Sequence, residues 1–485
     1  MSSILRGGRL GATRNEIVNF ISSLYDDKRI AHTTVLVNEA HVIALTKAKA
    51  ISKSDARRLL RALRKLENRI PSRAGIEDVH VLIEEYAIKC AGREVGGQLH
   101  LAKSRNDQVV TAIRMVLREE LLEISNLLIT LETKLLQLAS RHLKSIFPGY
   151  THLQPAQPIS FAHYLLAITD SLLRDNQRLL ETYRRVNKSP MGAGALAGSS
   201  LNLDRTIEST LLGFQGLVEN TLDAIGSRDF ALETLSVLSI IALDLTRIAQ
   251  DLIFYSSADV GILNIPEEFT STSSIMPQKK NPDPLEIIRA RSARVIGNCN
   301  TAATMLHALP SGYNLDFQEV TPLVWNSCDT IRSCLRILSQ LIPRIRPVES
   351  TAHRDYLQYT ASTEIANTLV REENIPFRTA HRSVGHVVKT TLEQNKSLSE
   401  LTHAEWERGL GIRLSKKTFT SIRRTFDLVR HILYYRTKGS PNPRQTARMI
   451  SSRTMQIKSF SAQSADAYRK LENAAAKLSS VTRRI

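Results

Sequence analysis

Residues 109–135 read VVTAIRMVLREELLEISNLLITLETKL, in the middle of a fifty-residue stretch, 98–147, that contains neither Gly nor Pro. Its apolar residues recur at spacings of three and four, which is the period of an amphipathic α-helix. One helix over most of this stretch would be on the order of 60 Å long, given a rise of 1.5 Å per residue. The repeating apolar positions are Val109, Ile113, Val116, Leu117, Leu121, Ile124, Leu128, Leu131 and Leu135.

Two further regions have the same helical character. Residues 227–260 also lack Gly and Pro, and a third region, 297–342, is interrupted near Pro310, Gly312 and Pro322. Helices longer than ~25 residues are typical of extended bundles. Their apolar positions spread over more than one face, so we expect each to pack against several neighbours, including other subunits. The predicted fold class is all-α, with an elongated central long-helix bundle flanked by two smaller helical domains.

The ends of these helices suggest three domains. Residues 1–103 are expected to form an N-terminal helical domain, 104–352 the central bundle, and 353–485 a C-terminal helical domain with a basic tail. Hydrophobic residues make up 42% and charged residues 23% of the 485-residue chain. These values exclude disordered and low-complexity proteins.

Cysteine usage and hydropathy indicate where the protein resides. The N-terminal residues contain no apolar core of a signal peptide, and no stretch reaches the ~20 apolar residues of a membrane span. We therefore expect a cytoplasmic protein in a reducing compartment, with no metal site built from cysteines. The four cysteines are too irregularly spaced for a disulfide framework: Cys90, Cys299, Cys328 and Cys334.

Four polar segments are candidates for chemistry. The densest, STSSIMPQKKNPD at 271–283, combines hydroxyls, backbone N–H groups, lysines and an Asn that suit a carboxylate or phosphate. HLAKSRNDQ at 100–108 stands where the first long helix begins, so its Arg and Asn could meet an anion at the positive helix end. The other two are GYTHLQ at 149–154 and GYNLDFQE at 312–319. Each segment alone is also explained by an ordinary solvated loop or turn.

Together these segments resemble known motifs. SSIMPQKKNPD resembles the signature of the fumarase/aspartase superfamily. The segments SRNDQ, GYTHLQPAQPISFAH, SPMGAGALAG, NTLDAIGSRDF and IPFRTAHRSVG narrow the resemblance to the argininosuccinate lyases, from Gly7-Gly8-Arg9 to about Gly439. The resemblance implies a fumarase/aspartase-like fold and anti β-elimination of argininosuccinate to L-arginine and fumarate, in arginine biosynthesis. It also implies no metal, no cofactor, and a homotetramer in which three subunits build each active site.

The motif positions imply roles for individual residues. Ser273 matches the catalytic base, His152 the residue assigned to protonating the leaving group, and Glu286 the carboxylate that pairs with that histidine. Lys279 and Asn281 would hold the carboxylate on which negative charge builds up. The remaining matches are positions that contact substrate: Ser23, Arg105, Asn106, Thr151, Tyr313 and Gln318.

Four positions depart from the family pattern. Thr272 replaces a Gly that could act as a loop hinge, and Ala102-Lys103 stand where the family has Gly-Arg. Thr321 occupies the place of a Lys that contacts substrate in the family. A hydrogen bond from a cation to a carboxylate contributes about 1.5–3 kcal/mol. A neighbouring Arg or Lys could take its place.

Alternatives to this function are an adenylosuccinate-type lyase and a non-catalytic, crystallin-like relative. The SRNDQ, QPAQP and NTLDAIGSRDF segments favour argininosuccinate, and the presence of Ser273, His152 and Lys279 favours catalysis. GAGALAG at 192–198 has GxGxxxG spacing and no preceding strand, which favours a tight turn over a dinucleotide site. A nucleic-acid partner would rest on charge alone and is not favoured.

The excess of positive charge lies late in the chain. The net charge is +18, yet residues 353–485 hold 24 Lys and Arg against 11 Asp and Glu, which leaves only +5 for the first 352 residues. This distribution predicts a basic C-terminal surface, either solvated or facing an acidic subunit or a polyanion. We also expect that removing the residues after about Ser459 leaves elimination nearly unchanged.

Overall fold

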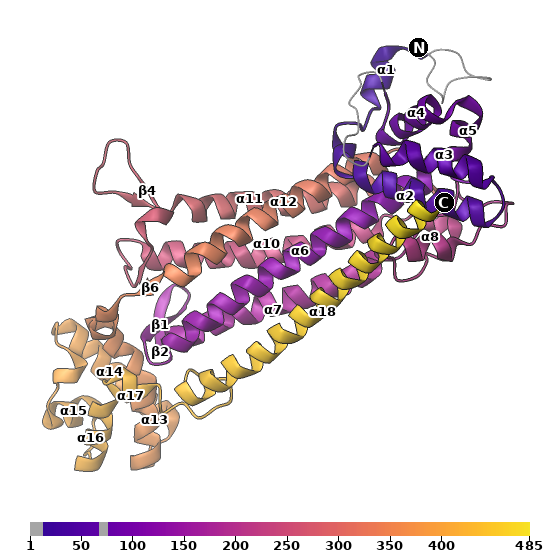
Figure 1. The fold of residues 1–485 in the computed structure, drawn as a ribbon. Helices are drawn as coiled ribbons and strands as arrows, with labels where there is room; N and C mark the ends of the chain where they lie inside the picture. The colour runs from indigo at the N-terminus through magenta and orange to yellow at the C-terminus, as the bar shows by residue number, and fades with distance from the viewer. Residues whose placement is uncertain (1–12, 67–75) are drawn as a thin grey trace.

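Long helices run side by side through the middle of the molecule, with clusters of shorter helices at both ends (Figure 1). The computed structural model describes residues 13–66 and 76–485, so the Gly7-Gly8-Arg9 segment lies outside the described residues. The long helices are α6 (Arg105–Arg141), α7 (Phe161–Val186), α10 (Asp229–Ser256), α11 (Asp283–Leu306), α12 (Phe317–Leu341) and α18 (Pro443–Arg484).

The helix α6 lies at the centre of this bundle. It begins with a capping box, in which the Ser104 hydroxyl accepts the N–H of Asn106 and the Asp107 carboxylate accepts the N–H of Ser104. Its leucines are buried against α7, α12 and α18 in one continuous apolar core. Two of the charged residues on α6, Glu132 and Arg118, are buried with these leucines.

The all-α prediction is confirmed, with small differences at the helix ends. The first two predicted helices correspond to α6, which has 37 residues, and to α10, which has 28. The third region is two helices, α11 and α12, separated by residues 307–316. Pro322 does not end the helix. It lies within α12, near the N-terminal end, and its missing N–H removes one helical hydrogen bond.

Within the part of the chain that the structure describes, three short two-stranded ribbons were not predicted from the sequence. Pro148, Pro155 and Pro158 obscure the strand pattern of the longest ribbon, yet a two-stranded ribbon consists only of edge strands and tolerates proline. The antiparallel pairs are β1 (Ile146–Thr151) with β2 (Gln154–Ser160), β3 (Leu263–Asn264) with β6 (Arg346–Pro347), and β4 (Ser271–Thr272) with β5 (Lys280–Asn281).

Shorter helices form the two end clusters. The cluster after residue 353 has a core of its own, centred on the fully buried Trp406. No helix within 13–66 or 76–485 is both long and apolar enough to cross a membrane. The shorter α-helices are α1 (Asn15–Phe20), α2 (Ala31–Lys47), α3 (Lys53–Arg64), α4 (Val79–Ala91), α5 (Arg93–Gly97), α8 (Arg205–Leu211), α9 (Thr221–Gly226), α13 (Ser362–Glu373), α14 (Phe377–Glu393), α15 (His403–Leu410), α16 (Lys416–Thr425) and α17 (Leu428–His431).

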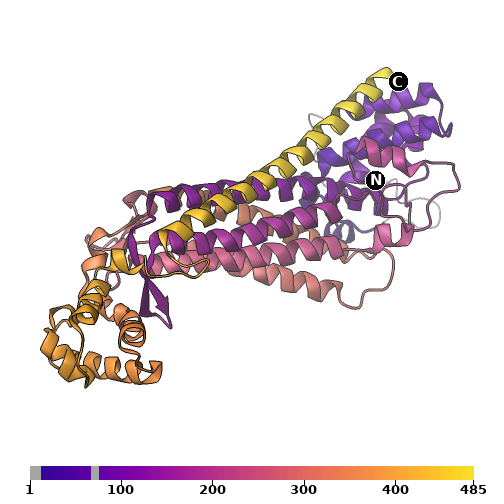
Figure 2. The ribbon, with the colours of Figure 1, turned by 90° about the horizontal axis from the view of Figure 1, so that it is seen from below.

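The last helix, α18, leaves the C-terminal cluster and returns along the bundle to the N-terminal cluster (Figure 2). Arg453 forms an ion pair of 2.8 Å with Asp170 on α7, and Phe460 is buried in the main core. The division of the chain at 103 and 352 stays a prediction. The tail expected within 353–485 is, however, a helix of the bundle, and the expectation that elimination survives removal of the residues after Ser459 stays a prediction.

The end of α18 offers a test of this structural role. Leu478 is 2% exposed and packs in a small core with Val37, Ile43 and Leu212, whereas the adjacent Lys477 is exposed. Replacing Leu478 with alanine is expected to lower the free energy of unfolding by about 3 kcal/mol, the usual cost of such a cavity. Lys477→Ala is the matched control and should change it by less than about 0.5 kcal/mol. Equal denaturation midpoints for the two variants would contradict this packing.

Candidate active site

A pocket lies where the start of α6 meets the start of α12 and the short 3₁₀ helix η1 (Asp26–Arg29). Four of the predicted substrate-contacting residues line it, although they come from widely separated parts of the sequence. Thr321, the position that departs from the family pattern, lines the same pocket. The four are Ser23, Arg105, Tyr313 and Gln318.

Hydrogen bonds hold three of these side chains, and a ring contact holds that of Tyr313. Arg105, the first residue of α6, donates to Asp78 Oδ2 at 2.7 Å, and Gln318 Nε2 donates to the carbonyl oxygen of Ile21 at 3.1 Å. The ring of Tyr313 lies edge-on to that of Phe317, with 5.7 Å between the centroids. These contacts hold the polar groups in place before any ligand binds.

The acidic side of the pocket includes a carboxyl group with an unusual pKa. Asp27 accepts hydrogen bonds from the Ser23 hydroxyl at 2.8 Å and from the Val79 N–H at 3.1 Å. Burial nevertheless raises the pKa of Asp27 to about 7, and the nearby Asp78 adds to this effect. Arginines and carboxyl groups therefore line one pocket, which suits a ligand carrying both anionic and cationic groups.

Several charged or titratable residues of this pocket were missed in the sequence, among them Asp27, Asp78, Arg228 and His80. Arg228 lies within the NTLDAIGSRDF motif and is 5% exposed, and His80 lies at the start of α4. Burial lowers the pKa of His80 to about 4, so this imidazole is neutral near pH 7. The NTLDAIGSRDF motif includes Arg228, but no spacing in the sequence indicates that the Arg228 side chain reaches the pocket.

Asn106 does not line the pocket but supports the start of α6. Its Nδ2 donates to the carbonyl oxygen of Ala195 at 3.2 Å, and the N–H of Gly194 donates to Asp107 at 2.9 Å. Both partners belong to the turn at 192–198, in which Gly194 has φ of 62°. The prediction of a tight turn at these residues is therefore confirmed.

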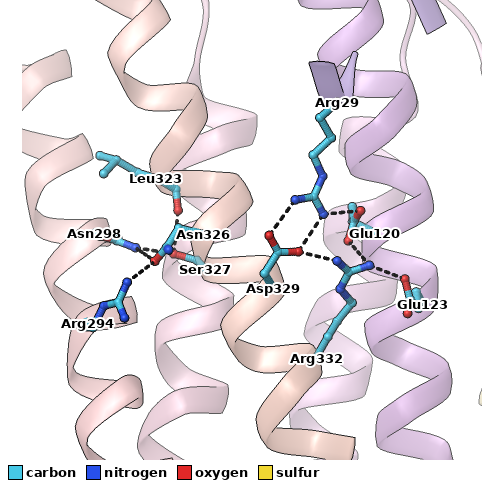
Figure 3. A network of polar contacts seen from close by, with 10 residues as sticks. All are labelled: Arg29, Glu120, Glu123, Arg294, Asn298, Leu323, Asn326, Ser327, Asp329 and Arg332. Atoms are coloured by element: carbon cyan, nitrogen blue, oxygen red, sulfur yellow. Dashed lines mark hydrogen bonds and ion pairs between the residues drawn. The ribbon is translucent and has the colours of Figure 1, made fainter. Parts of the chain in front are cut away.

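A network of charged side chains connects the helices near the pocket, although none of its members lines the pocket (Figure 3). Arg29 of η1 forms ion pairs with Asp329 of α12 at 2.9 Å and with Glu120 of α6 at 2.5 Å. Arg332 of α12 pairs with Glu120 at 3.0 Å and with Glu123 at 2.6 Å. The three elements that carry the pocket are thus tied together.

The predicted base lies elsewhere, in a hairpin that projects from the bundle (Figure 1). The oxygen of Ser273 accepts hydrogen bonds from the backbone N–H groups of Ile275 at 3.3 Å and Met276 at 3.1 Å. Ile275 is 83% exposed, and Lys279 is also exposed. Asn281 pairs with Ser271 at the base of this hairpin.

Thr272, which replaces a glycine of the family pattern, pairs with Lys280 in the same ribbon. An extended backbone suits a β-branched residue, so this departure fits the local structure.

A second hairpin carries His152 and Thr151. His152 and Leu153 form its two-residue turn with φ of 54° and 57°, which matches the positive values that tight hairpins require. Both side chains are exposed. Glu286 lies in the first turn of α11, also exposed, and makes no contact with His152 among the described residues.

Helix lengths show how far apart these groups are within one chain. Arg105 begins α6 and His152 follows its end, so the 37 residues of α6, ~55 Å of helix, separate them. Ser273 precedes α11 and Tyr313 follows it, so the 24 residues of α11, ~36 Å, lie between these two. One chain therefore brings the pocket residues together but leaves both hairpins at the opposite end of the bundle.

Two parts of the chain match known protein families. Residues 11–297 match the lyase family, and residues 359–429 match the family described as argininosuccinate lyase C-terminal. The chain is 38% identical to the argininosuccinate lyase of Methanococcus aeolicus over 97% of both chains. It is 41% identical to that of Methanothrix thermoacetophila over 98% of both chains.

Solved structures agree with these matches. The structure of EDDS lyase in complex with formate has a TM-score of 0.89 at 26% identity, covering 98% of this chain and 96% of that one. The class II fumarase of Schistosoma mansoni shows the same fold, with a TM-score of 0.71 at 17% identity, covering 83% of this chain and 90% of the fumarase. Bundle and pocket thus define a lyase of the fumarase/aspartase superfamily. Within that class, the chain belongs to the argininosuccinate lyase family.

Proposed function

We propose that this protein cleaves argininosuccinate into L-arginine and fumarate by anti β-elimination. The observation that carries this proposal is the pocket, in which Arg105 and Arg228 lie with Asp27 and Asp78 around one space. Argininosuccinate carries three carboxylates and a guanidino group, so a pocket with both signs of charge matches its chemistry. The argininosuccinate lyases that share more than a third of its residues support the same substrate.

Ser273 is the proposed base that removes a proton from the carbon next to a succinyl carboxylate. A free serine hydroxyl is far too weak a base, but the two backbone N–H groups that already point at its oxygen would stabilise the deprotonated form. Lys279 and Asn281 would hold the carboxylate that gains negative charge. His152, oriented by Glu286, would protonate the departing guanidino nitrogen.

The active site would be assembled from several copies of the chain in a homotetramer. Since Ser273 and His152 lie at the opposite end of the bundle from Arg105 and Tyr313, hairpins of other copies must reach each pocket. Both hairpins are exposed in a single chain, which supports this arrangement. Catalytic groups work best where water is excluded, so other copies of the chain would have to cover them. We place this tetramer in the cytoplasm.

The function is tested by mixing the purified protein with argininosuccinate and following fumarate by its ultraviolet absorbance. Release of fumarate and arginine in equal amounts is expected, with adenylosuccinate left intact in a parallel reaction. Faster fumarate release from adenylosuccinate would show that adenylosuccinate is the substrate instead. If neither compound yields fumarate near neutral pH, a non-catalytic, crystallin-like role is the better account.

A further inference from the structure

The pocket contains a buried guanidinium group that no carboxylate neutralises. Arg228 is 5% exposed, and it makes no ion pair within residues 13–66 and 76–485. Its Nη1 donates to the carbonyl oxygens of Ile225 at 3.1 Å and Ser227 at 2.8 Å, and its Nε has no partner. Although burial lowers its pKa to about 10, the side chain is still charged near pH 7.

Neighbouring groups increase the need for an anion at this position. Of the carboxyl groups that line the same pocket, Asp78 is bound to Arg105 and Asp27 to Ser23, and burial raises the pKa of Asp27 to about 7. Asp26, the third, forms no ion pair with Arg228 among the described residues. A second buried guanidinium, that of Arg114, lies close enough to repel Arg228. An uncompensated buried charge is strongly destabilising, so an anionic ligand would stabilise this arrangement.

The position of Arg228 relates it directly to Thr321. Its guanidinium carbon lies 4.3 Å from the ring centre of Phe317 and 5.9 Å from that of Tyr313. Thr321 lies one helical turn beyond Phe317 on α12, so both side chains share the face of the helix that lines the pocket. Arg228 and the side chain at position 321 thus line the same part of the pocket.

We propose that Arg228 binds a carboxylate of the substrate in this pocket, next to the place that a cation at position 321 would occupy. This inference rests on the proposed function, because it takes argininosuccinate as the ligand. Because Thr321 carries no charge, Arg228 is the cation on this side of the pocket. Its backbone hydrogen bonds hold the guanidinium in position, which leaves part of its donor fork for the ligand.

The first test compares the kinetics of R228Q, T321K and the double variant R228Q/T321K. Loss of a charge-assisted hydrogen bond predicts a rise in KM on the order of 10- to 100-fold for R228Q. In the double variant the new lysine reaches the same carboxylate, so most of this loss should be recovered. An unchanged KM in R228Q, or a double variant as weak as R228Q, would overturn the proposal.

Arg114 provides a matched control. It is 3% exposed and donates to the carbonyl oxygens of Arg185 and Val186, both at 3.1 Å, but it does not line the pocket. R114Q therefore removes a buried guanidinium of the same kind and should leave KM within about twofold of the wild type, even where its unfolding temperature falls. A parallel rise of KM in R114Q would show that Arg228 acts only through the fold.

A binding measurement separates this inference from the proposed function. Calorimetric titration of fumarate and of L-arginine into the wild type, R228Q and T321K requires no turnover. R228Q is expected to lose at least tenfold in affinity for one of the two products, which identifies the carboxylate that is bound. T321K, which keeps Arg228, should gain affinity for the same product. This measurement tests the proposal even if R228Q does not fold. Unchanged affinities in the folded variants would reject Arg228 as the carboxylate site, whatever the wild type does with argininosuccinate.

Discussion

Replacing Ser273 with alanine is expected to lower kcat for fumarate release by roughly 10²- to 10⁴-fold, the usual contribution of a positioned base. The variant should bind argininosuccinate normally, because the serine oxygen acts only when the proton leaves. The side chain is partly exposed and lies outside the core, so the fold and the oligomer should be unaffected. Initial rates together with size-exclusion elution would check both points.

Ser274 provides the control for this variant. It lies next to Ser273 in the same loop, is exposed, and makes no side-chain hydrogen bond among the described residues. Ser274→Ala should therefore retain most of the activity. A Ser273→Ala protein that keeps more than about a tenth of the wild-type rate would assign the base to another residue.

Replacing Glu132 with glutamine is expected to stabilise the protein at pH 8 by about 4 kcal/mol, since one pKa unit corresponds to about 1.4 kcal/mol. Glu132 lies inside the bundle on α6 and is fully buried, with only the Asn176 side chain near enough to offset part of the cost of burying its charge. Burial raises its pKa from 4.5 to about 8, and the nearby Asp175 adds to the shift. The folded protein therefore holds this proton more tightly than the unfolded chain.

The sign of this effect sets its pH dependence. Below about pH 4.5 both states are protonated at Glu132, so the wild type and Glu132→Gln should be equally stable. As the pH rises towards 8 the unfolded chain loses the proton first, and the wild type alone loses stability. Urea denaturation across this range measures the difference, and Glu472→Gln, exposed on α18, is the control. A constant difference between wild type and Glu132→Gln at all pH values would contradict the shifted pKa.

Much of the fold could be predicted from the sequence, because apolar periodicity reports directly on helices that bury a face. α6 and α10 follow from it within a few residues. α18 was missed since the residues it buries include Thr446, Ser464 and Ala467, which carry little hydrophobic signal. The longest ribbon was missed because its prolines break the alternation typical of strands.

Motifs predicted four residues of the pocket but missed Arg228 and His80, and they gave no information on its geometry. Arg105, Tyr313 and Ser273 lie in short polar segments that match family motifs, and this makes them recognisable in the sequence. Their separation depends on the lengths and packing of α6 and α11, which local patterns do not encode. The significance of Arg228 lies in the absence of a counter-ion, and that feature exists only in three dimensions.

The central claim is that argininosuccinate is cleaved at sites built from separate copies of the chain. The most direct measurement is fumarate release by a mixture of two inactive variants, Ser273→Ala and Arg105→Gln, unfolded together and allowed to reassemble. If the two residues of a site come from different copies, about one quarter of the sites in random symmetric assemblies are intact, and about a quarter of the wild-type rate returns. A mixture no more active than its separate parents would contradict the shared site.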